Sequence, residues 1–290
     1  MYKRILICLL LILPGVVWSQ PDTKPLSLKE QRKQRPLYIK MTTGSGISYY
    51  NDFATSALTY MGFPIYFSGS LLRSDHMKES ELGFGITDGS NCLALAGDDV
   101  YYSSFENIEL FYGQLYKVNL LSAERLNFKL GWKLHNAFIL RSNSDLLNNA
   151  NGAELFPSLM GSFKVSADLS RRQTVEKKFL FIRYKLNPVK RDLSFGMNIG
   201  IVNGVYRNKF AYIGQSDLLN DSKIFDNYQF NILTGFRAST SLDYTVFLNN
   251  KNALRCSYVW DVYKSGKQIE TFQLANHSLR VSLLFNLNNR

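Results

Sequence analysis

The chain has 290 residues and carries 34 Lys and Arg against 23 Asp and Glu, which gives a formal net charge of +11. Hydrophobic residues make up 46% of the chain and charged residues 20%, so an intrinsically disordered or collagen-like chain is excluded. Only three cysteines are present, which argues against a disulfide scaffold and against a cysteine-built metal site. The length suits one large domain or two small ones.

The first 19 residues have the pattern of a secretory signal peptide. Lys3 and Arg4 precede an apolar run over residues 5–17, and residues 17–19 suit a cleavage point between Ser19 and Gln20. A membrane anchor needs about 20 apolar residues, and this run is shorter and contains a proline. We therefore expect export, followed by a mature chain that remains basic.

Residues 20–36 form the next predicted segment. They hold more Lys and Arg than Asp and Glu and no apolar periodicity. We interpret them as a basic periplasmic N-terminal segment, and a solvated tail is favoured over a segment that binds a partner or folds into the mouth of a barrel.

After residue 20 no stretch holds 18 consecutive apolar residues, which argues against helical membrane spans. Apolar and polar residues instead alternate with period two, which is typical of strands with one apolar and one polar face. The clearest examples cover residues 108–120, 128–138, 193–201 and 254–262.

The alternation over residues 228–248 continues for about 20 residues, far beyond the 5 or 6 typical of soluble strands. The strands of a soluble antiparallel sandwich also alternate. A membrane barrel is favoured by the long strands, the signal peptide, the 14% aromatic content and the polar faces of Gly, Ser, Asn and Lys. The sequence predicts an all-β fold, a transmembrane antiparallel up-and-down β-barrel over residues 37–287.

Eleven strand-like runs are visible, beginning near residues 37, 57, 81, 105, 126, 158, 179, 193, 228, 253 and 269. Bacterial single-chain barrels have an even number of strands, so we predict 12 strands, with 10 as the alternative if one run between residues 156 and 187 lies outside the wall. Polar breaks at residues 75–80, 122–125, 188–192 and 249–252 predict short periplasmic turns. Polar stretches at residues 88–104, 141–152 and 207–227 predict extracellular loops.

The C-terminal third carries a family resemblance. Residues 257–266, Ser-Tyr-Val-Trp-Asp-Val-Tyr-Lys-Ser-Gly, and residues 277–287 resemble the closing hairpin of uncharacterised outer-membrane β-barrel proteins of Bacteroidota. The junction between Ser19 and Gln20 looks like their signal cleavage sites. The resemblance implies an outer-membrane address, with membrane lipids and the outer-membrane assembly machinery as partners, and it implies no activity. The chain ends in Arg290 rather than in the aromatic residue that commonly closes such barrels.

The polar faces of the predicted strands give a candidate lumen that is more basic than acidic. Its predicted basic side chains are Lys40, Lys117, Lys129, Lys133, Lys164, Arg183, Lys185, Arg237, Arg255 and Arg280. Its predicted acidic side chains are Glu109, Asp168, Asp243 and Asp261. Lys and Arg rings favour anions in a pore, so one reading is a narrow passage for small anionic solutes.

The alternative is a filled structural barrel that binds a partner through its extracellular loops, because barrels near eight strands are packed solid. An outer-membrane hydrolase is the second alternative and depends on His135 alone. His277 and Ser278 are adjacent on a strand and so point to opposite faces, which prevents a dyad. We predict no catalytic residue, cofactor or metal, and no nucleic-acid partner; the oligomeric state stays open.

Overall fold

The computed structural model describes residues 35–53, 56–143, 151–179, 181–208, 228–266 and 271–288. The predicted cleavage site at Ser19 and Gln20 and almost all of the basic segment lie outside the described residues. Residues 36–290 form one compact unit.

The described chain is built from antiparallel strands and one short 3-10 helix, η1 (Asn119–Leu121). The strands are β1 (Leu37–Asp52), β2 (Ser56–Gly62), β3 (Ile65–Ser74), β4 (Lys78–Ala96), β5 (Asp99–Lys117), β6 (Leu126–Ser142), β7 (Asn151–Asp168), β8 (Val175–Phe179), β9 (Ile182–Leu186), β10 (Arg191–Asn208), β11 (Tyr228–Ile232), β12 (Phe236–Phe247), β13 (Ala253–Ser265) and β14 (Phe272–Asn286). In the described part of the chain, no helix is long and apolar enough to cross a membrane.

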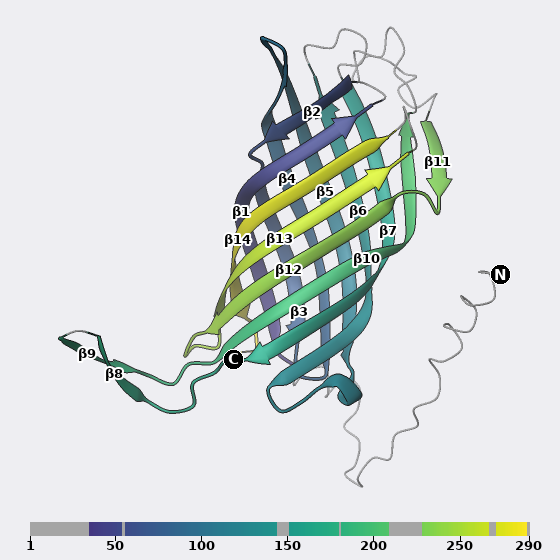
Figure 1. The fold of residues 1–290 in the computed structure, drawn as a ribbon. Helices are drawn as coiled ribbons and strands as arrows, with labels where there is room; N and C mark the ends of the chain where they lie inside the picture. Colours follow the sequence, from purple (N-terminus) through teal and green to yellow (C-terminus); the bar gives the residue numbers. More distant parts are fainter. Residues whose placement is uncertain are drawn as a thin grey trace, which may run out of the picture. The chain divides into compact units, whose positions relative to one another are not determined.

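Twelve of these strands form one sheet that closes on itself (Figure 1). Closure comes from two antiparallel ladders, β7 with β10 and β1 with β14, and the second runs without a break from Tyr38–Asn286 to Asp52–Phe272. Closing the sheet removes its exposed edges. The all-β antiparallel up-and-down barrel expected from the sequence is confirmed.

The described strands occupy ten positions around the wall. β2 and β3 pair with successive halves of β1, and β11 and β12 pair with successive parts of β10, so each couple fills a single position. The run near residue 179 lies outside the wall, because β8 and β9 pair with each other in a separate two-stranded sheet. The ten-strand alternative therefore describes the wall, and the count of 12 is reached by counting both halves of the interrupted positions.

Both ends of the barrel sheet meet at one opening, which we call the terminal end. The amide of Leu287 donates to the carbonyl of Leu37 over 2.8 Å. Short connections at residues 75–77, 118–125 and 248–252 lie at this end, close to three of the predicted turns. The predicted turn at residues 188–192 is wrong, because the β7–β10 connection covers residues 169–190 and contains the β8–β9 hairpin.

The opposite opening, the distal end, differs more from the predicted loops. The loop expected over residues 88–104 is wrong: β4 continues to Ala96 and β5 begins at Asp99. Their ladder persists after a bulge between Gly89 and Cys92, and Gly97, with φ of 65°, forms the tight turn. The other two predicted loops begin later than expected, because β6 extends to Ser142 and β10 extends to Asn208. The rest of these stretches, residues 144–150 and 209–227, lies outside the described residues.

The single long strand expected over residues 228–248 is also interrupted. Leu233 and Gly235 have φ of 60° and 81°, so the chain turns out of extended geometry between β11 and β12. A left-handed leucine carries no sequence signature, which explains why the alternation hid this break.

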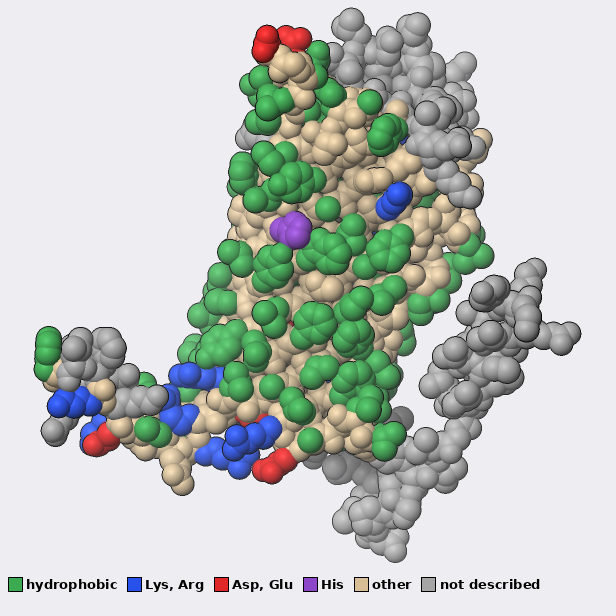
Figure 2. Space-filling model, in the orientation of Figure 1, with side chains coloured by type: hydrophobic (Ala, Val, Ile, Leu, Met, Phe, Trp, Pro, Cys, Tyr) green, Lys and Arg blue, Asp and Glu red, His purple; other side chains and the backbone are tan. Residues whose placement is uncertain are grey.

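The wall has an apolar exterior and a mixed interior. Met41, Phe67, Leu110 and Leu279 are among its exterior side chains, and each is more than half exposed. Figure 2 shows hydrophobic side chains over the visible wall, with most of the visible charged side chains toward the terminal end and acidic side chains at the distal tip. The exposed apolar residues are the predicted ones, since Ile108 and Leu110 face outward while Glu109 is buried.

Candidate functional site

An apolar layer fills the lumen in its distal half. We call it the apolar plug, and its buried members are Tyr50, Tyr60, Cys92, Ala94, Phe105, Ala137, Ile139, Phe156, Val205, Tyr263, Phe272 and Leu274. The ring centroids of Phe156 and Tyr263 lie 4.2 Å apart, although β10 and β12 separate their strands in the wall. Phe156 also packs on Phe272 at 5.6 Å, and its side chain has no exposed surface. Rings from separated strands thus meet in the middle of the lumen and close it.

A buried ion-pair cluster lies beside the plug at the distal ends of the strands. Arg141 places Nη2 at 2.8 Å from Oδ2 of Asp52 and at 3.0 Å from Oε1 of Glu154. Arg207 places Nη2 at 2.8 Å from Oδ1 of Asp52, and its guanidinium lies 5.5 Å from the Phe272 ring centroid. Because the four charged side chains are almost completely buried, each carboxylate needs its basic partners.

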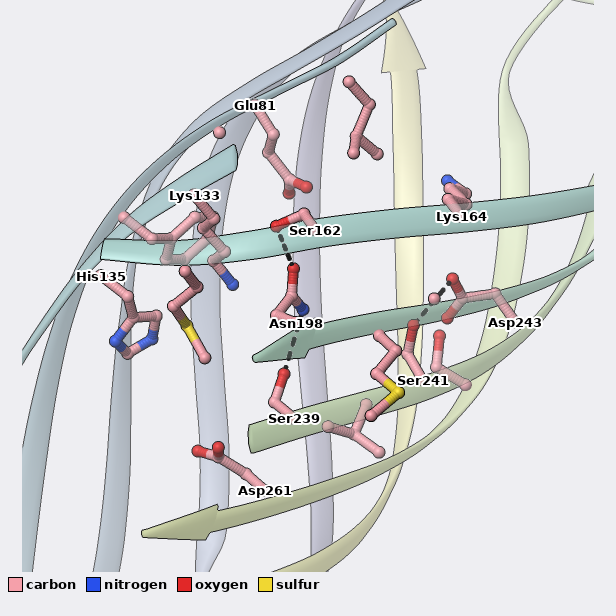
Figure 3. Close-up of a pocket in the computed structure, with 18 of the residues that line it drawn as sticks. Glu81, Lys133, His135, Ser162, Lys164, Asn198, Ser239, Ser241, Asp243 and Asp261 are labelled. Atoms are coloured by element: carbon pink, nitrogen blue, oxygen red, sulfur yellow. Dashed lines mark hydrogen bonds between the residues drawn. The ribbon is translucent and has the colours of Figure 1, made fainter. Parts of the chain in front are cut away.

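On the terminal side of the plug the lumen opens into a polar cavity of about 210 Å³, which we call the chamber. Figure 3 shows a row of hydrogen bonds along its wall. Ser162 donates to Oδ1 of Asn198 over 2.7 Å, and Asn198 donates through Nδ2 to Oγ of Ser239 over 3.1 Å. The three residues come from neighbouring strands β7, β10 and β12, so inward-facing positions of the ladders align the row.

Several charged residues of the chamber form ion pairs. Lys40 lies 2.8 Å from Glu81, and Lys164 lies 2.9 Å from Glu79. A second set, around Arg237, is longer: the guanidinium lies 3.6 Å from Asp261 and 4.0 Å from Glu109, and Glu109 lies 3.7 Å from Nε2 of His135.

Three basic side chains of the chamber have no carboxylate within 4.0 Å among the described residues: Lys133, Arg255 and Arg280. The ammonium of Lys133 lies 4.8 Å from the Phe111 ring centroid, and the guanidinium of Arg280 lies 3.6 Å from that of Tyr66.

A second cavity, of about 310 Å³, lies at the terminal mouth and shares Glu79, Lys164 and Arg255 with the chamber. The chamber and the mouth cavity are therefore neighbours with these three residues between them, while the plug closes the chamber toward the distal end. At this mouth Nζ of Lys117 lies 2.7 Å from Nε2 of His76. Partial burial, together with the charges of Lys117 and Lys129, lowers the pKa of His76 from its ordinary value of 6.5.

Most of the predicted lumen residues do point into the barrel. Those that line the chamber or the mouth cavity are Lys40, Lys129, Lys133, Lys164, Arg237, Arg255, Arg280, Glu109, Asp168, Asp243 and Asp261. Lys117 lies at the mouth and is half-buried. The placement of Arg183 and Lys185 in the lumen is wrong, because both lie on β9 of the separate hairpin, where Lys185 pairs with Glu176 at 2.8 Å in the open.

The predicted excess of ten basic over four acidic lumen residues is likewise corrected. Six basic and five acidic side chains of the described chain line the chamber. The sequence analysis missed Glu79 and Glu81, although they share the period-two face of β4; treating residues 75–80 as a turn hid that pattern. It also missed the distal ion-pair cluster, whose two arginines, Arg141 and Arg207, are the first residues of two stretches that were interpreted as loops.

Two of the described histidines lie on wall strands, His135 on β6 inside the barrel and His277 on β14 outside it. His135 is buried beside Glu109, and no described hydroxyl or thiol forms a hydrogen bond with its ring. His277 is on the exterior, with Nδ1 2.6 Å from the Tyr258 hydroxyl, whereas Ser278 is buried inside, as the alternation predicts. Within the described ranges, no group of three or more His, Cys, Asp and Glu side chains is arranged to hold a metal ion.

Comparison with protein-family models finds no match, and comparison with curated proteins finds none either. Three similar solved structures are remote in sequence. The transport unit of the autotransporter AIDA-I from Escherichia coli is 8% identical, with 91% of this chain and 92% of that chain covered and a TM-score of 0.43. The translocator domain of the autotransporter NalP from Neisseria meningitidis is 12% identical, with 87% and 88% covered and a TM-score of 0.37. A mutant of the TodX monoaromatic hydrocarbon channel is 8% identical, with 87% and 90% covered and a TM-score of 0.30.

Proposed function

We propose that the chain is a non-enzymatic outer-membrane β-barrel whose lumen is closed in the structure described here, and that it acts at the cell surface as a structural or partner-binding barrel. The observation that carries the proposal is the contact of Phe156 with Tyr263 in the middle of the lumen. Apolar rings packed without exposed surface leave no water-filled path past them.

The exterior supports a membrane location. A spanning strand needs about 9–11 residues, and most wall strands are longer than that. Phe84 and Leu283 are each about half exposed on the outer face, which would be a liability in water and is favourable in lipid. In this setting the membrane lipids are the first partner of the wall.

The position of the chain ends supports an orientation. Single-chain outer-membrane barrels return both ends to the periplasm and have short turns there. β1 begins and β14 ends at the terminal end, which also carries short turns at residues 75–77 and 248–252. The terminal end then faces the periplasm, and the distal end faces the outside.

Conductance in a planar bilayer tests the closed lumen. We expect the refolded wild-type barrel to be silent and the double variant Phe156→Ala/Tyr263→Ala to conduct, because the truncations remove the two rings that meet in the lumen. Phe163→Ala is the matched control, since Phe163 lies on the same strand and faces outward, in contact with Phe195. Stepwise conductance by the wild type would refute the closed barrel.

A gated passage for small anions is the second candidate. It is favoured by the position of the mouth cavity next to the chamber and by the three basic side chains without a carboxylate partner. In the conducting double variant, adding Lys129→Glu and Lys133→Glu is expected to shift the reversal potential in a salt gradient from anion toward cation preference. An unchanged reversal potential would count against this candidate.

A further inference from the structure

We propose that the chamber is a binding site for a small oxyanion of the phosphate or sulfate class that enters from the terminal mouth. The site needs only the barrel described above. It does not require the lumen to conduct, so the binding site and the closed barrel can fail separately.

The charge of the chamber is the first argument. After the ion pairs of Lys40, Lys164 and Arg237 are set aside, three basic side chains remain without a carboxylate partner, and Asp243 alone remains on the acidic side. The nearest partners of Asp243 are the hydroxyls of Ser194 and Ser241, each at 3.5 Å. Because Arg237 pairs with both Asp261 and Glu109, that set carries a net charge of −1, and the six basic and five acidic side chains leave a surplus of one positive charge. This surplus lies in a partly enclosed space and favours a small anion, to which the three basic side chains without a carboxylate partner are available.

The second argument is the way the cations are held. The guanidinium of Arg280 lies against the Tyr66 ring at 3.6 Å, and its Nε donates to Oγ of Ser278 over 2.9 Å. Stacking on a ring satisfies the face of a guanidinium and leaves N–H groups at its edge for an acceptor. Lys133 is held in a comparable way over Phe111. Two cations are thus fixed in position while their donors stay available.

Neutral donors complete the site. The row of Ser162, Asn198 and Ser239 crosses three strands at the chamber wall, and Figure 3 shows Lys133 directed into the same space. Phosphate and sulfate have several acceptor oxygens, so they can use charged and neutral donors together. A volume of about 210 Å³ accommodates such an ion with some of its water, but not a large solute.

The third argument is the route by which an anion would enter the chamber. Arg255 lines both the chamber and the mouth cavity, and its Nε donates to Oγ1 of Thr245 over 3.0 Å. It therefore lies where an anion would pass from the mouth into the chamber. Entry from the distal end would require the apolar plug to open, so the structure favours the terminal, periplasmic route.

Calorimetric titration of the refolded full-length barrel with inorganic phosphate, and separately with sulfate, at low ionic strength tests the site. We expect binding with Kd below about 1 mM. Arg280→Met and Lys133→Met should each weaken it by about tenfold or more, whereas Arg280→Lys should retain part of the affinity. Lys185→Met is the matched control, because it removes an exposed basic charge outside the barrel. A folded wild-type barrel that binds neither ion, or variants that bind as tightly as wild type, would overturn the proposal.

A second measurement needs no variant and remains informative if one of them fails to fold. Reductive methylation of the wild-type barrel, followed by mass spectrometry, reports the accessibility of each lysine amino group. We expect phosphate to slow the labelling of Lys133 and to leave that of Lys185 unchanged. Equal labelling of Lys133 with and without phosphate would contradict a site at this residue.

Discussion

Arg141 of β6 lies 2.8 Å from the carboxylate of Asp52 on β1, with β2, β4 and β5 between the two strands in the wall. The ion pair therefore spans the lumen rather than joining neighbouring strands. Asp52 also accepts from Arg207 of β10 at 2.8 Å, so one carboxylate ties together three separated parts of the barrel. Both contacts lie beside the apolar plug.

We expect Asp52→Asn to destabilise the barrel by about 3–5 kcal/mol, because it removes the charge shared by two buried guanidiniums. Urea unfolding of the refolded barrel, read by the loss of its heat-modifiable migration, measures the change. Glu176→Gln is the control: its ion pair with Lys185 is exposed, so the cost there should stay below about 1 kcal/mol. Equal unfolding midpoints for the two variants would contradict a structural role of the distal ion-pair cluster.

The proposed membrane location predicts that a charged side chain on the outer wall lowers the free energy of unfolding. Leu242 of β12 is 48% exposed and faces outward between Phe195 and Tyr258, so Leu242→Arg should cost about 2–4 kcal/mol in a bilayer. Leu120 on η1 is 93% exposed at the terminal end, and Leu120→Arg should change little. The comparison is made by unfolding in lipid vesicles. If Leu242→Arg lowered the free energy of unfolding no more than Leu120→Arg does, the result would argue for a water-exposed barrel.

The pairing of β5 and β6 depends on a close approach at Gly131. A Cβ at this position would lie 1.8 Å from the carbonyl oxygen of Gln114 on the neighbouring strand, so Gly131→Ala must displace backbone. At Gly113 the nearest atom would be 3.3 Å away, which a small shift relieves. We expect Gly131→Ala to lower the yield of folded barrel clearly more than Gly113→Ala, measured by the folded fraction after refolding. Equal yields for the two variants would show that the β5–β6 ladder can shift enough to accept a Cβ at Gly131.

The environment of His76 at the terminal mouth predicts how the stability of the barrel depends on pH. Because the pKa of His76 is lowered in the folded barrel, the unfolded chain binds the proton more readily, and this group destabilises the fold as the pH falls below about 6.5 toward the folded-state pKa. Lys117→Met removes the ammonium 2.7 Å from the ring and should raise the pKa of His76 toward its ordinary value. An NMR titration of the histidine ring protons measures the pKa of His76 in both proteins. An unchanged pKa of His76 would mean that partial burial and the other nearby lysines, and not Lys117, lower it.

Much of the wall was predictable because alternation fixes which residues face inward. Glu109, Lys133 and Asp261 are inside for this reason, and Leu110 and Leu254 are outside. The same alternation gave a wrong prediction at residues 175–186, where Arg183 and Lys185 were expected in the lumen. A hairpin outside the barrel alternates like a wall strand, and only its pairing with other strands distinguishes the two.

The closure of the lumen was not predictable from alternation. Phe105, Phe156 and Phe272 occupy inward positions, where the strands have apolar residues on both faces. Such a segment is compatible with either orientation, and only the assembled barrel shows that the three rings fill its centre. The distal ion-pair cluster has the same origin, because its partners are brought together by closure and not by spacing along the chain.

The ladder between β1 and β14 has a consequence for how the barrel is made. It joins the first and last strands of the wall over the full length of β1, and β14 also supplies Phe272 and Leu274 to the apolar plug. Neither the seam nor the plug can be complete before the last 20 or so residues arrive, and contacts of such long sequence separation are slow to form. On the proposed outer-membrane location, the chain must therefore be kept unfolded across the periplasm until its C-terminus is available, which makes assembly a late, all-or-none event.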